Sequence, residues 1–301
     1  MLHSLITAGW QVTALGRTPV AGVRSLVVDL MSAGFDLGRQ GYDTVVHVAG
    51  LAHRDSRSES ERERFFRVNV DGTRNLLMAL ECLPKLPESL VLISTVAVYG
   101  RESGSLLEET LPRRAGDPYG ASKRQAEDLC IVWCSRHNIR AGIARLPLVV
   151  GANAPGNFGK MVRGLARGSY MGIGSGAARH SIVLARDVGD IIPMIAARGG
   201  VFHLTDGYHP SFRELEEALC EVLGRRRPRR LPLAAARLGG LIGDGLEALL
   251  HLSSPLNSRT FQKMTATLTF SDQKARTALG WRPSRVLDHM VELVKQPWRA
   301  S

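Results

Sequence analysis

A tyrosine and a lysine four residues apart are the best candidates in this chain for proton transfer. Tyr119 and Lys123 lie in the segment 118–123, PYGASK, and their spacing places both side chains on one face of an expected helix. A neighbouring ammonium group stabilises a phenolate, so the spacing predicts a Tyr119 pKa below its ordinary value. Such a phenol can act as a general acid or base at a hydroxyl or carbonyl carbon. For an isolated match, an ordinary exposed helix turn is the alternative.

A hydroxyl group is expected close to this pair. Thr95 lies in the segment 92–100, LISTVAVYG, where an apolar strand ends in hydroxyl-bearing residues. Ligands of open α/β sheets bind at the carboxyl ends of the strands. We therefore expect Thr95 to hydrogen-bond the reacting oxygen and to orient it toward Tyr119. Capping or a turn is the alternative role for this threonine.

Short apolar runs alternate with longer helical patterns, which is typical of βαβ units and a parallel sheet. The pattern predicts helices at 61–81 and 119–137, and an apolar helical stretch at 231–252. The expected fold class is α/β, a doubly wound parallel sheet of the Rossmann type with a smaller C-terminal substrate lobe. Residues 1–150, with a strand near 201–205, would form the dinucleotide-binding domain, and residues 151–180 and 207–301 the substrate-binding lobe. The other strands are expected at 11–15, 25–28, 44–48, 90–94 and 141–145.

The start of the chain departs from this pattern. Dinucleotide folds begin with a strand, then a glycine-rich turn that meets the pyrophosphate, then a helix. Here residues 1–8 resemble the end of that helix, and Gly9 resembles its cap. The first strand and the glycine-rich loop are therefore expected to be missing, and a true start upstream of Met1 is favoured over a degenerate copy. Without that strand, its neighbours in the sheet would stay unpaired along one edge.

Composition excludes several classes of protein. The chain has 301 residues, of which 44% are hydrophobic, as in an ordinary globular protein. No apolar run reaches the roughly 20 residues of a membrane span, and no signal peptide is recognisable, so we expect a cytoplasmic protein. Four cysteines are too few for a disulfide framework and lack metal-binding spacing, so no metal is expected. Cys130 and Cys134, one helical turn apart, are assigned to packing.

The charge is strongly basic. The net charge is +11, and only six of the 39 basic residues are lysines. The densest run is RRRPRR at 225–230. No nucleic-acid recognition motif accompanies this charge, so no nucleic-acid partner is predicted. A positive cleft for a diphosphate substrate, or a basic surface that meets anionic lipid, explains the same balance.

Several separated blocks together resemble one family. They are VVHVAG at 45–50, NVDGT at 69–73, RLP at 145–147 and KARTALGWRP at 274–283, in addition to Thr95 and the Tyr119 and Lys123 pair. In this order they resemble the extended short-chain dehydrogenase/reductase family, also called the NAD-dependent epimerase/dehydratase family. The resemblance covers nearly the whole chain.

The resemblance implies a role for each matching residue. Thr95, Tyr119 and Lys123 match the catalytic hydroxyl, tyrosine and lysine, and Lys123 would also contact the nicotinamide ribose. The cofactor-side positions that match are Asp29, near the adenine, and Ala49 and Gly50, in the turn beside the cofactor.

On the substrate side, Asn157 and Arg179 match positions that hold a diphosphate, for which a planar guanidinium is well suited. Without the family, a turn-forming asparagine and a surface arginine would be the simpler interpretations. The resemblance also makes a homodimer possible.

Two departures from the family narrow the expectation. Val96 and Ala97 stand where the dehydratases carry an Asp-Glu pair, so a 4,6-dehydratase is not expected. Gly16 and Arg17 stand at the end of the second expected strand, where NAD-selective members carry an acid. An arginine there suits the 2′-phosphate of NADP, although it can equally cover the adenine. The expected cofactor is NADP or NAD.

The expected function is NAD(P)-dependent hydride transfer at C4 of a nucleotide-linked sugar. Reduction of a UDP-4-keto-6-deoxy-N-acetyl sugar for surface polysaccharide biosynthesis is favoured, and a UDP-sugar 4-epimerase is the alternative. An alternative of another class is a truncated, non-catalytic relative that only binds a nucleotide sugar or a partner. His47 is expected to be a core histidine, and HRD at 53–55 has no kinase context around it.

Overall fold

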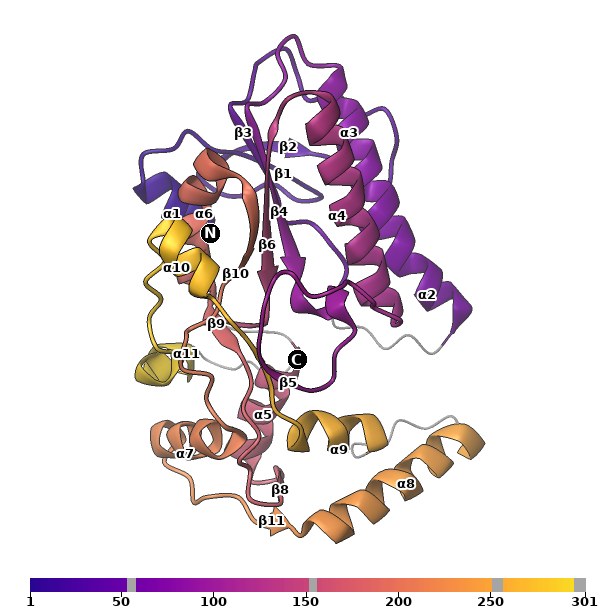
Figure 1. Ribbon diagram of the computed structural model, residues 1–301, viewed down its shortest axis with the longest axis vertical. Helices are drawn as coiled ribbons and strands as arrows, with labels where there is room; N and C mark the ends of the chain where they lie inside the picture. Colours follow the sequence, from indigo (N-terminus) through magenta and orange to yellow (C-terminus); the bar gives the residue numbers. More distant parts are fainter. Residues whose placement is uncertain (53–57, 152–155, 251–256, 295–301) are drawn as a thin grey trace.

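A four-stranded parallel sheet forms the centre of the molecule (Figure 1). The computed structural model describes residues 1–52, 58–151, 156–250 and 257–294. Strand β4 is buried along nearly its whole length, as expected for a strand covered on both faces. The predicted strands are confirmed, with ends that differ by one or two residues. In sheet order the strands are β10 (Gly200–His203), β6 (Arg140–Leu146), β4 (Ser89–Thr95) and β3 (Thr44–His47).

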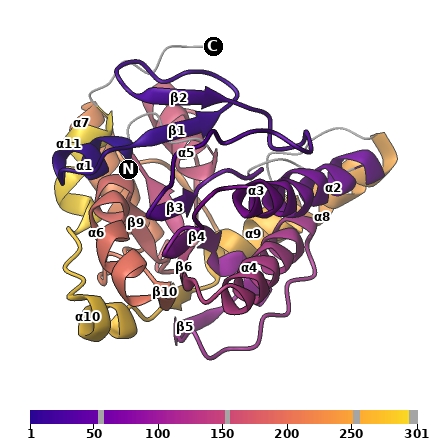
Figure 2. The ribbon, with the colours of Figure 1, turned by 90° about the horizontal axis from the view of Figure 1, so that it is seen from above.

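Helices cover both faces of this sheet (Figure 2). On one face, Leu90 and Leu92 pack among side chains from the helices there, including Trp133. On the other face, Val91 packs against Ile192. This alternation along β4 is the period of two that a strand imposes on its side chains. The first face carries α2 (Glu59–Phe66), η1 (Arg67–Asp71), α3 (Gly72–Glu81) and α4 (Pro118–Arg136), and the second carries α6 (Ala185–Arg198) with α1 (Leu2–Thr7).

The segment predicted as one helix over 61–81 is helical throughout, but a π-helical turn interrupts it. This turn is η1, Arg67–Asp71, and it lies between α2 and α3. A π turn adds one residue to the helix and is often found at functional sites. Here it buries Asn69, whose contacts are described below.

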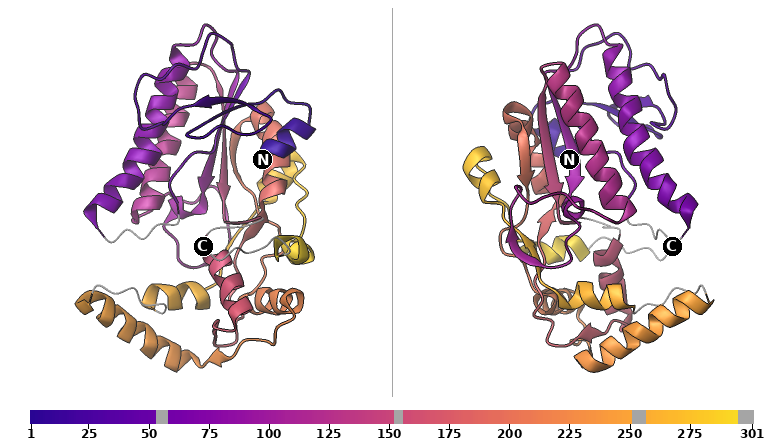
Figure 3. Two further views of the ribbon diagram at one scale, coloured as in Figure 1. Left: turned by 180° about the vertical axis from the view of Figure 1, so that it is seen from behind. Right: turned by 45° about the vertical axis from the view of Figure 1, so that its right-hand side comes forward.

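Strands β1 (Thr13–Gly16) and β2 (Arg24–Val27) form a separate parallel pair. Figure 3 shows this pair running across the direction of the main sheet. Within the residues that the structure describes, β1 pairs only with β2, and β3 pairs only with β4. Each of β1 and β3 therefore has one edge without a strand partner among the described residues.

The lower part of the molecule in Figure 1 is a smaller lobe with its own apolar core. Val150, Phe158 and Leu219 are among the buried side chains of this core. Near the C-terminus, α10 packs against α6 and β10, so that segment returns to the sheet domain. The remaining elements are β5 (Gly104–Leu107), η2 (Val96–Tyr99), β7 (Leu148–Val150), α5 (Gly156–Arg167), β8 (Gly172–Ile173), β9 (Ile182–Leu184), α7 (Phe212–Leu223), β11 (Arg230–Leu231), α8 (Leu233–Leu250), α9 (Ser258–Thr265), β12 (Leu268–Phe270), α10 (Gln273–Leu279), η3 (Val286–His289) and α11 (Met290–Val294).

Candidate active site

The three predicted catalytic residues meet where β4 ends and α4 begins. Asp117 caps α4 by accepting a hydrogen bond from the Gly120 amide at 3.0 Å, which places Tyr119 in the first turn. Tyr119 lies close enough to Thr95, the last residue of β4, for the threonine hydroxyl to lower the pKa of the phenol. Lys123 is buried one turn further along α4. The structure therefore brings the three predicted residues together, and their catalytic roles stay predictions.

The electrostatics of the cluster differ from the expectation. Burial raises the pKa of Tyr119, the hydrogen bond from Thr95 opposes this rise, and the charge of Asp117 adds to it. The Lys123 ammonium donates a hydrogen bond to the carbonyl oxygen of Ile93 at 2.8 Å, so it is bonded to the backbone of β4. Burial lowers the pKa of Lys123 itself to about 8. The prediction of a lowered Tyr119 pKa is therefore wrong.

Asn69 fixes the turn beside Lys123, and sequence reasoning gave it no role. Its amide oxygen accepts a hydrogen bond from the Leu51 backbone N–H at 2.6 Å, and its amide nitrogen donates to the Leu51 carbonyl at 3.1 Å. The same nitrogen donates to Ser122 Oγ at 2.9 Å. The loop after β3 is thus tied to α4. A buried amide in an apolar helix was the available signal, because such a group needs partners.

The space beside Gly50 in that loop is small. A Cβ atom at Gly50 would lie 3.1 Å from Asn69 Oδ1 and 3.6 Å from Lys123 Nζ. The backbone at Gly50 can therefore be approached closely by a ligand that also reaches Lys123. This cradle is the feature that fits the ribose end of a nicotinamide cofactor.

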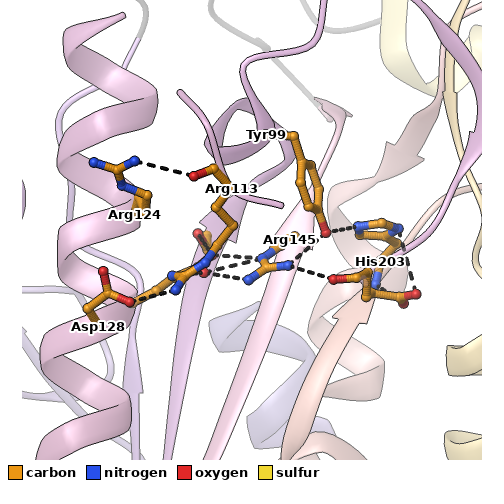
Figure 4. A network of polar contacts seen from close by, with 9 residues as sticks. Tyr99, Arg113, Arg124, Asp128, Arg145 and His203 are labelled. Carbon is orange, nitrogen blue, oxygen red and sulfur yellow. Dashed lines mark hydrogen bonds and ion pairs between the residues drawn. The ribbon is translucent and has the colours of Figure 1, made fainter. Parts of the chain in front are cut away.

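A buried polar network holds α4 against the sheet. Arg145, near the end of β6, donates to both carboxylate oxygens of Glu127 and to the Tyr99 hydroxyl at 2.7 Å. The Tyr99 hydroxyl also bonds His203 Nε2 at 2.6 Å. Figure 4 shows Arg145 between Arg113, on the side facing α4, and the pair Tyr99 and His203.

Glu127 connects this network to the catalytic residues. Tyr119, Lys123 and Glu127 follow one another at intervals of four residues, so they share one face of α4. Glu127 is fully buried, and it accepts further hydrogen bonds from Ser94 Oγ at 2.5 Å and Arg113 at 3.1 Å. The network therefore fixes the rotation and height of the helix that presents Tyr119. We regard Glu127 and Arg145 as positioning residues.

The residues expected on the cofactor side all follow parallel strands. Arg17 comes directly after β1 and is exposed, and Asp29 follows β2 and accepts a hydrogen bond from the Met31 amide at 3.0 Å. Ala49 and Gly50 follow β3 and are exposed. Strand ends of this kind are the usual place for a dinucleotide. Together with the cradle at Gly50, they fit NAD or NADP.

The residues expected on the substrate side belong to the lobe. Asn157 is exposed in the first turn of α5. Arg179 is half-exposed, donates to the carbonyl oxygen of His209 at 2.9 Å and lies 3.4 Å from a carboxylate oxygen of Glu214. These contacts hold the guanidinium of Arg179 while part of it remains free to meet a ligand.

The residues assigned to packing behave as expected. His47 is buried, bonds Thr73 Oγ1 at 2.8 Å, and burial lowers its pKa to about 3, so it is neutral at physiological pH. Cys130 and Cys134 are buried free thiols. His53 lies outside the described residues. Within the described ranges, no cluster of side chains could hold a metal ion, and no helix is long and apolar enough to cross a membrane.

Comparison with known proteins identifies relatives with this architecture. The chain is 28% identical over 250 residues to the N-acetyl-alpha-D-glucosaminyl-diphospho-ditrans,octacis-undecaprenol 4-epimerase of Escherichia coli O157:H7, covering 81% of this chain and 74% of that protein. It is 27% identical over 208 residues to the GDP-6-deoxy-D-mannose reductase of Pseudomonas aeruginosa, covering 62% of this chain and 65% of that protein.

The fold is similar to that of solved structures. The structure of MoeE5 in complex with UDP-glucose and NAD matches with a TM-score of 0.74 at 21% identity, covering 98% of this chain and 92% of that one. Residues 1–203 match the model of the NAD dependent epimerase/dehydratase family. The chain therefore belongs to the NAD-dependent epimerase/dehydratase family, whose enzymes are nucleotide-sugar epimerases and reductases that use NAD or NADP.

Proposed function

We propose that this chain reduces the C4 carbonyl of a nucleotide-linked 4-keto sugar, with a UDP-4-keto-6-deoxy-N-acetyl sugar of surface polysaccharide biosynthesis as the candidate substrate. The observation that carries the proposal is that Tyr119 and Lys123, one turn apart on α4, lie beside Thr95 at the end of β4. The raised pKa of Tyr119 keeps its phenol protonated at neutral pH. A protonated phenol is the form that a carbonyl reduction needs, because the new alkoxide must receive a proton.

Each residue has a defined part in this reaction. Thr95 donates a hydrogen bond to the keto oxygen and holds it near the phenol. Tyr119 gives its proton to that oxygen as negative charge develops there, so the carbonyl becomes a hydroxyl. A bound nicotinamide supplies the hydride to C4. Lys123, beside Gly50, holds the ribose and contributes positive charge near the developing oxyanion.

A 4-epimerase is the second candidate, and the likeness to the Escherichia coli 4-epimerase over 81% of the chain favours it. The same residues would serve, but Tyr119 must first accept the proton of the C4 hydroxyl. The keto sugar would then turn before C4 is reduced from its other face. For that direction a deprotonated Tyr119 is needed, which the burial of the phenol opposes.

The remaining assignments complete the proposal. Asn157 and Arg179 would hold the diphosphate of the substrate, and Arg17 would pair with the 2′-phosphate of NADP. A homodimer would form through the outer faces of α3 and α4, where a groove includes Met78 and Val132, both more than half exposed. We place the enzyme in the cytoplasm.

One assay separates these functions. The protein is mixed with NADPH and a UDP-4-keto-6-deoxy-N-acetyl sugar, and cofactor absorbance is followed with nuclear magnetic resonance spectra of the sugar. A reductase consumes NADPH in proportion to the 4-hydroxy sugar formed. A second reaction with NAD and a UDP-hexose tests the epimerase, which interconverts C4 epimers without net consumption of cofactor. Absence of both reactions would contradict the proposal and favour a non-catalytic sugar-binding protein.

A further inference from the structure

Helix α8 carries its large apolar side chains on the outside. Leu238, Leu241 and Ile242 are 60%, 59% and 56% exposed, and Leu233 at the start of the helix is 53% exposed. A helix on a protein surface ordinarily buries such side chains and exposes polar ones. Among residues 233–245 of α8, the buried ones are small: Ala236, Gly240 and Gly243.

The small residues explain how α8 stays attached while its leucines face outward. A Cβ atom at Gly240 would lie only 3.3 Å from the Ser258 amide nitrogen, so glycine allows α9 to pack closely against α8. On the opposite side, Leu238, Leu241 and Ile242 follow the i, i+3, i+4 spacing of a continuous stripe. Figure 3 shows α8 along the lower margin of the lobe in both views.

Exposed cationic side chains lie in the segment that leads into α8. The segment 225–250 contains six arginines and two acids, Asp244 and Glu247, and five of the arginines precede α8. Two of the six are held by carboxylates, because Arg227 pairs with Glu217 and Arg230 with Glu216. The remaining exposed cations of this segment are Arg225, Arg226, Arg229 and Arg237.

We infer that this surface docks onto a bilayer that contains anionic phospholipids. The docking surface consists of Leu238, Leu241 and Ile242 with Arg237 beside them and the exposed arginines that precede the helix. An apolar stripe bordered by arginines is the pattern of a helix that lies in the membrane interface, with leucines among the acyl chains and guanidinium groups at the headgroups.

A bilayer fits this surface better than a folded partner does. The stripe lies on a helix at the margin of the molecule, where a flat, fluid surface can reach all of it (Figure 1). The excess of arginine over acid matches the negative surface of a cytoplasmic leaflet. No helix in the described parts of the chain could span a membrane, so the chain would lie on the bilayer. This inference is independent of the reaction at Tyr119.

Vesicle co-sedimentation tests the inference with the full chain. Vesicles of phosphatidylcholine mixed with phosphatidylglycerol should pellet the protein, and vesicles of phosphatidylcholine alone should pellet much less. The double variant Leu238→Gln/Leu241→Gln should weaken partitioning by about tenfold or more, because two apolar side chains lose their burial. The variant Arg225→Gln/Arg226→Gln should weaken it several-fold per arginine, and added salt should do the same.

Matched variants make the result interpretable. Met194→Gln, which changes an exposed apolar side chain on α6, should leave partitioning unchanged. Leu241→Trp should shift its fluorescence to shorter wavelength on mixing with anionic vesicles, which reports insertion without removing the apolar face. Equal pelleting by both vesicle types, or no effect of the leucine variant, would overturn the inference. So would a leucine variant that changes the sedimentation coefficient of the free protein, because the surface would then bind a second copy.

Discussion

Lys123 couples the chemistry of this protein to its stability. Its ammonium group is buried against β4, and burial lowers its pKa from 10.5 to about 8. A buried charge costs the folded state free energy, and each unit of pKa shift corresponds to about 1.4 kcal/mol. The catalytic lysine is therefore also a source of instability, as is common where a site is built for function.

We predict that Lys123→Met abolishes hydride transfer but stabilises the fold at pH 7 by up to about 3 kcal/mol, the size of the pKa shift. Below pH 8 the folded and unfolded wild-type chains both carry the Lys123 proton, so the full cost is present. Between about pH 8 and 10.5 the folded chain has lost that proton and the unfolded chain retains it, so the cost falls as pH rises. Urea unfolding of both proteins across this range measures the difference. A constant difference would contradict the assigned pKa.

Arg17 decides the cofactor preference if it pairs with a 2′-phosphate. We predict that Arg17→Ala weakens NADP binding by roughly 1.5–3 kcal/mol, the scale of a hydrogen bond to a charged group. NAD affinity should be almost unchanged, because NAD lacks that phosphate. Titration of both cofactors by calorimetry measures this. If Arg17→Ala weakens the binding of NAD and NADP equally, Arg17 only covers the adenine.

At the scale of elements, α4 is positioned by buried charge as well as by apolar packing. Glu127 and Arg145 are 0% and 4–5% exposed and pair at 2.7 Å, which joins α4 to β6. Removing one partner of a buried pair leaves an uncompensated charge, whereas removing both does not. The strength of this connection can therefore be measured by substitution.

We predict that Glu127→Gln lowers the free energy of unfolding by about 3–5 kcal/mol, and that Glu127→Gln/Arg145→Met recovers much of this loss. Denaturant unfolding measures both variants. As a control, Arg74→Met breaks the exposed ion pair of Arg74 and Asp71. This change should lower the free energy of unfolding by about 1 kcal/mol or less. If Glu127→Gln lowers the free energy of unfolding no more than the control does, the network does not hold α4 in place.

Sequence patterns located the elements well because periodicity reports burial. The strand at Ser89–Thr95 and the helix at Pro118–Arg136 were predictable from apolar runs and from the motif at their junction. The roles of Asn69 and Glu127 were not, because their partners are distant in sequence: Asn69 bonds Leu51, and Glu127 bonds Arg145. The pKa of Tyr119 was mispredicted because spacing alone does not show that the fold buries the phenol, or that Lys123 bonds the Ile93 carbonyl.

At the scale of the whole molecule, the parallel strands form two separate units. The four-stranded sheet is covered on both faces, whereas all residues of the pair β1 and β2 are at least partly accessible. Backbone hydrogen bonds at an exposed edge open with little loss of buried area. Two regions of different local stability are therefore expected in one chain.

Hydrogen exchange measures this difference. We predict that amides of β1 and β2 exchange much faster than those of β4 and β6, because few buried contacts must be broken to expose them. The helical amides of α4, which packs on the sheet, serve as a slow internal reference. Equal protection of both strand groups would contradict this account and would mean that another segment covers the edge of β1.

The central claim is that Tyr119 transfers the proton that accompanies hydride transfer, and Tyr119→Phe tests it most directly. This change removes the hydroxyl and preserves the aromatic ring, whose centroid lies 6.0 Å from that of the Phe65 ring. Single-turnover oxidation of NADPH by a 4-keto sugar nucleotide should slow by roughly 10²–10⁴-fold, the usual contribution of general acid catalysis. Substrate affinity, measured separately by calorimetry, should stay nearly unchanged. Hydride transfer at the wild-type rate in this variant would contradict the account.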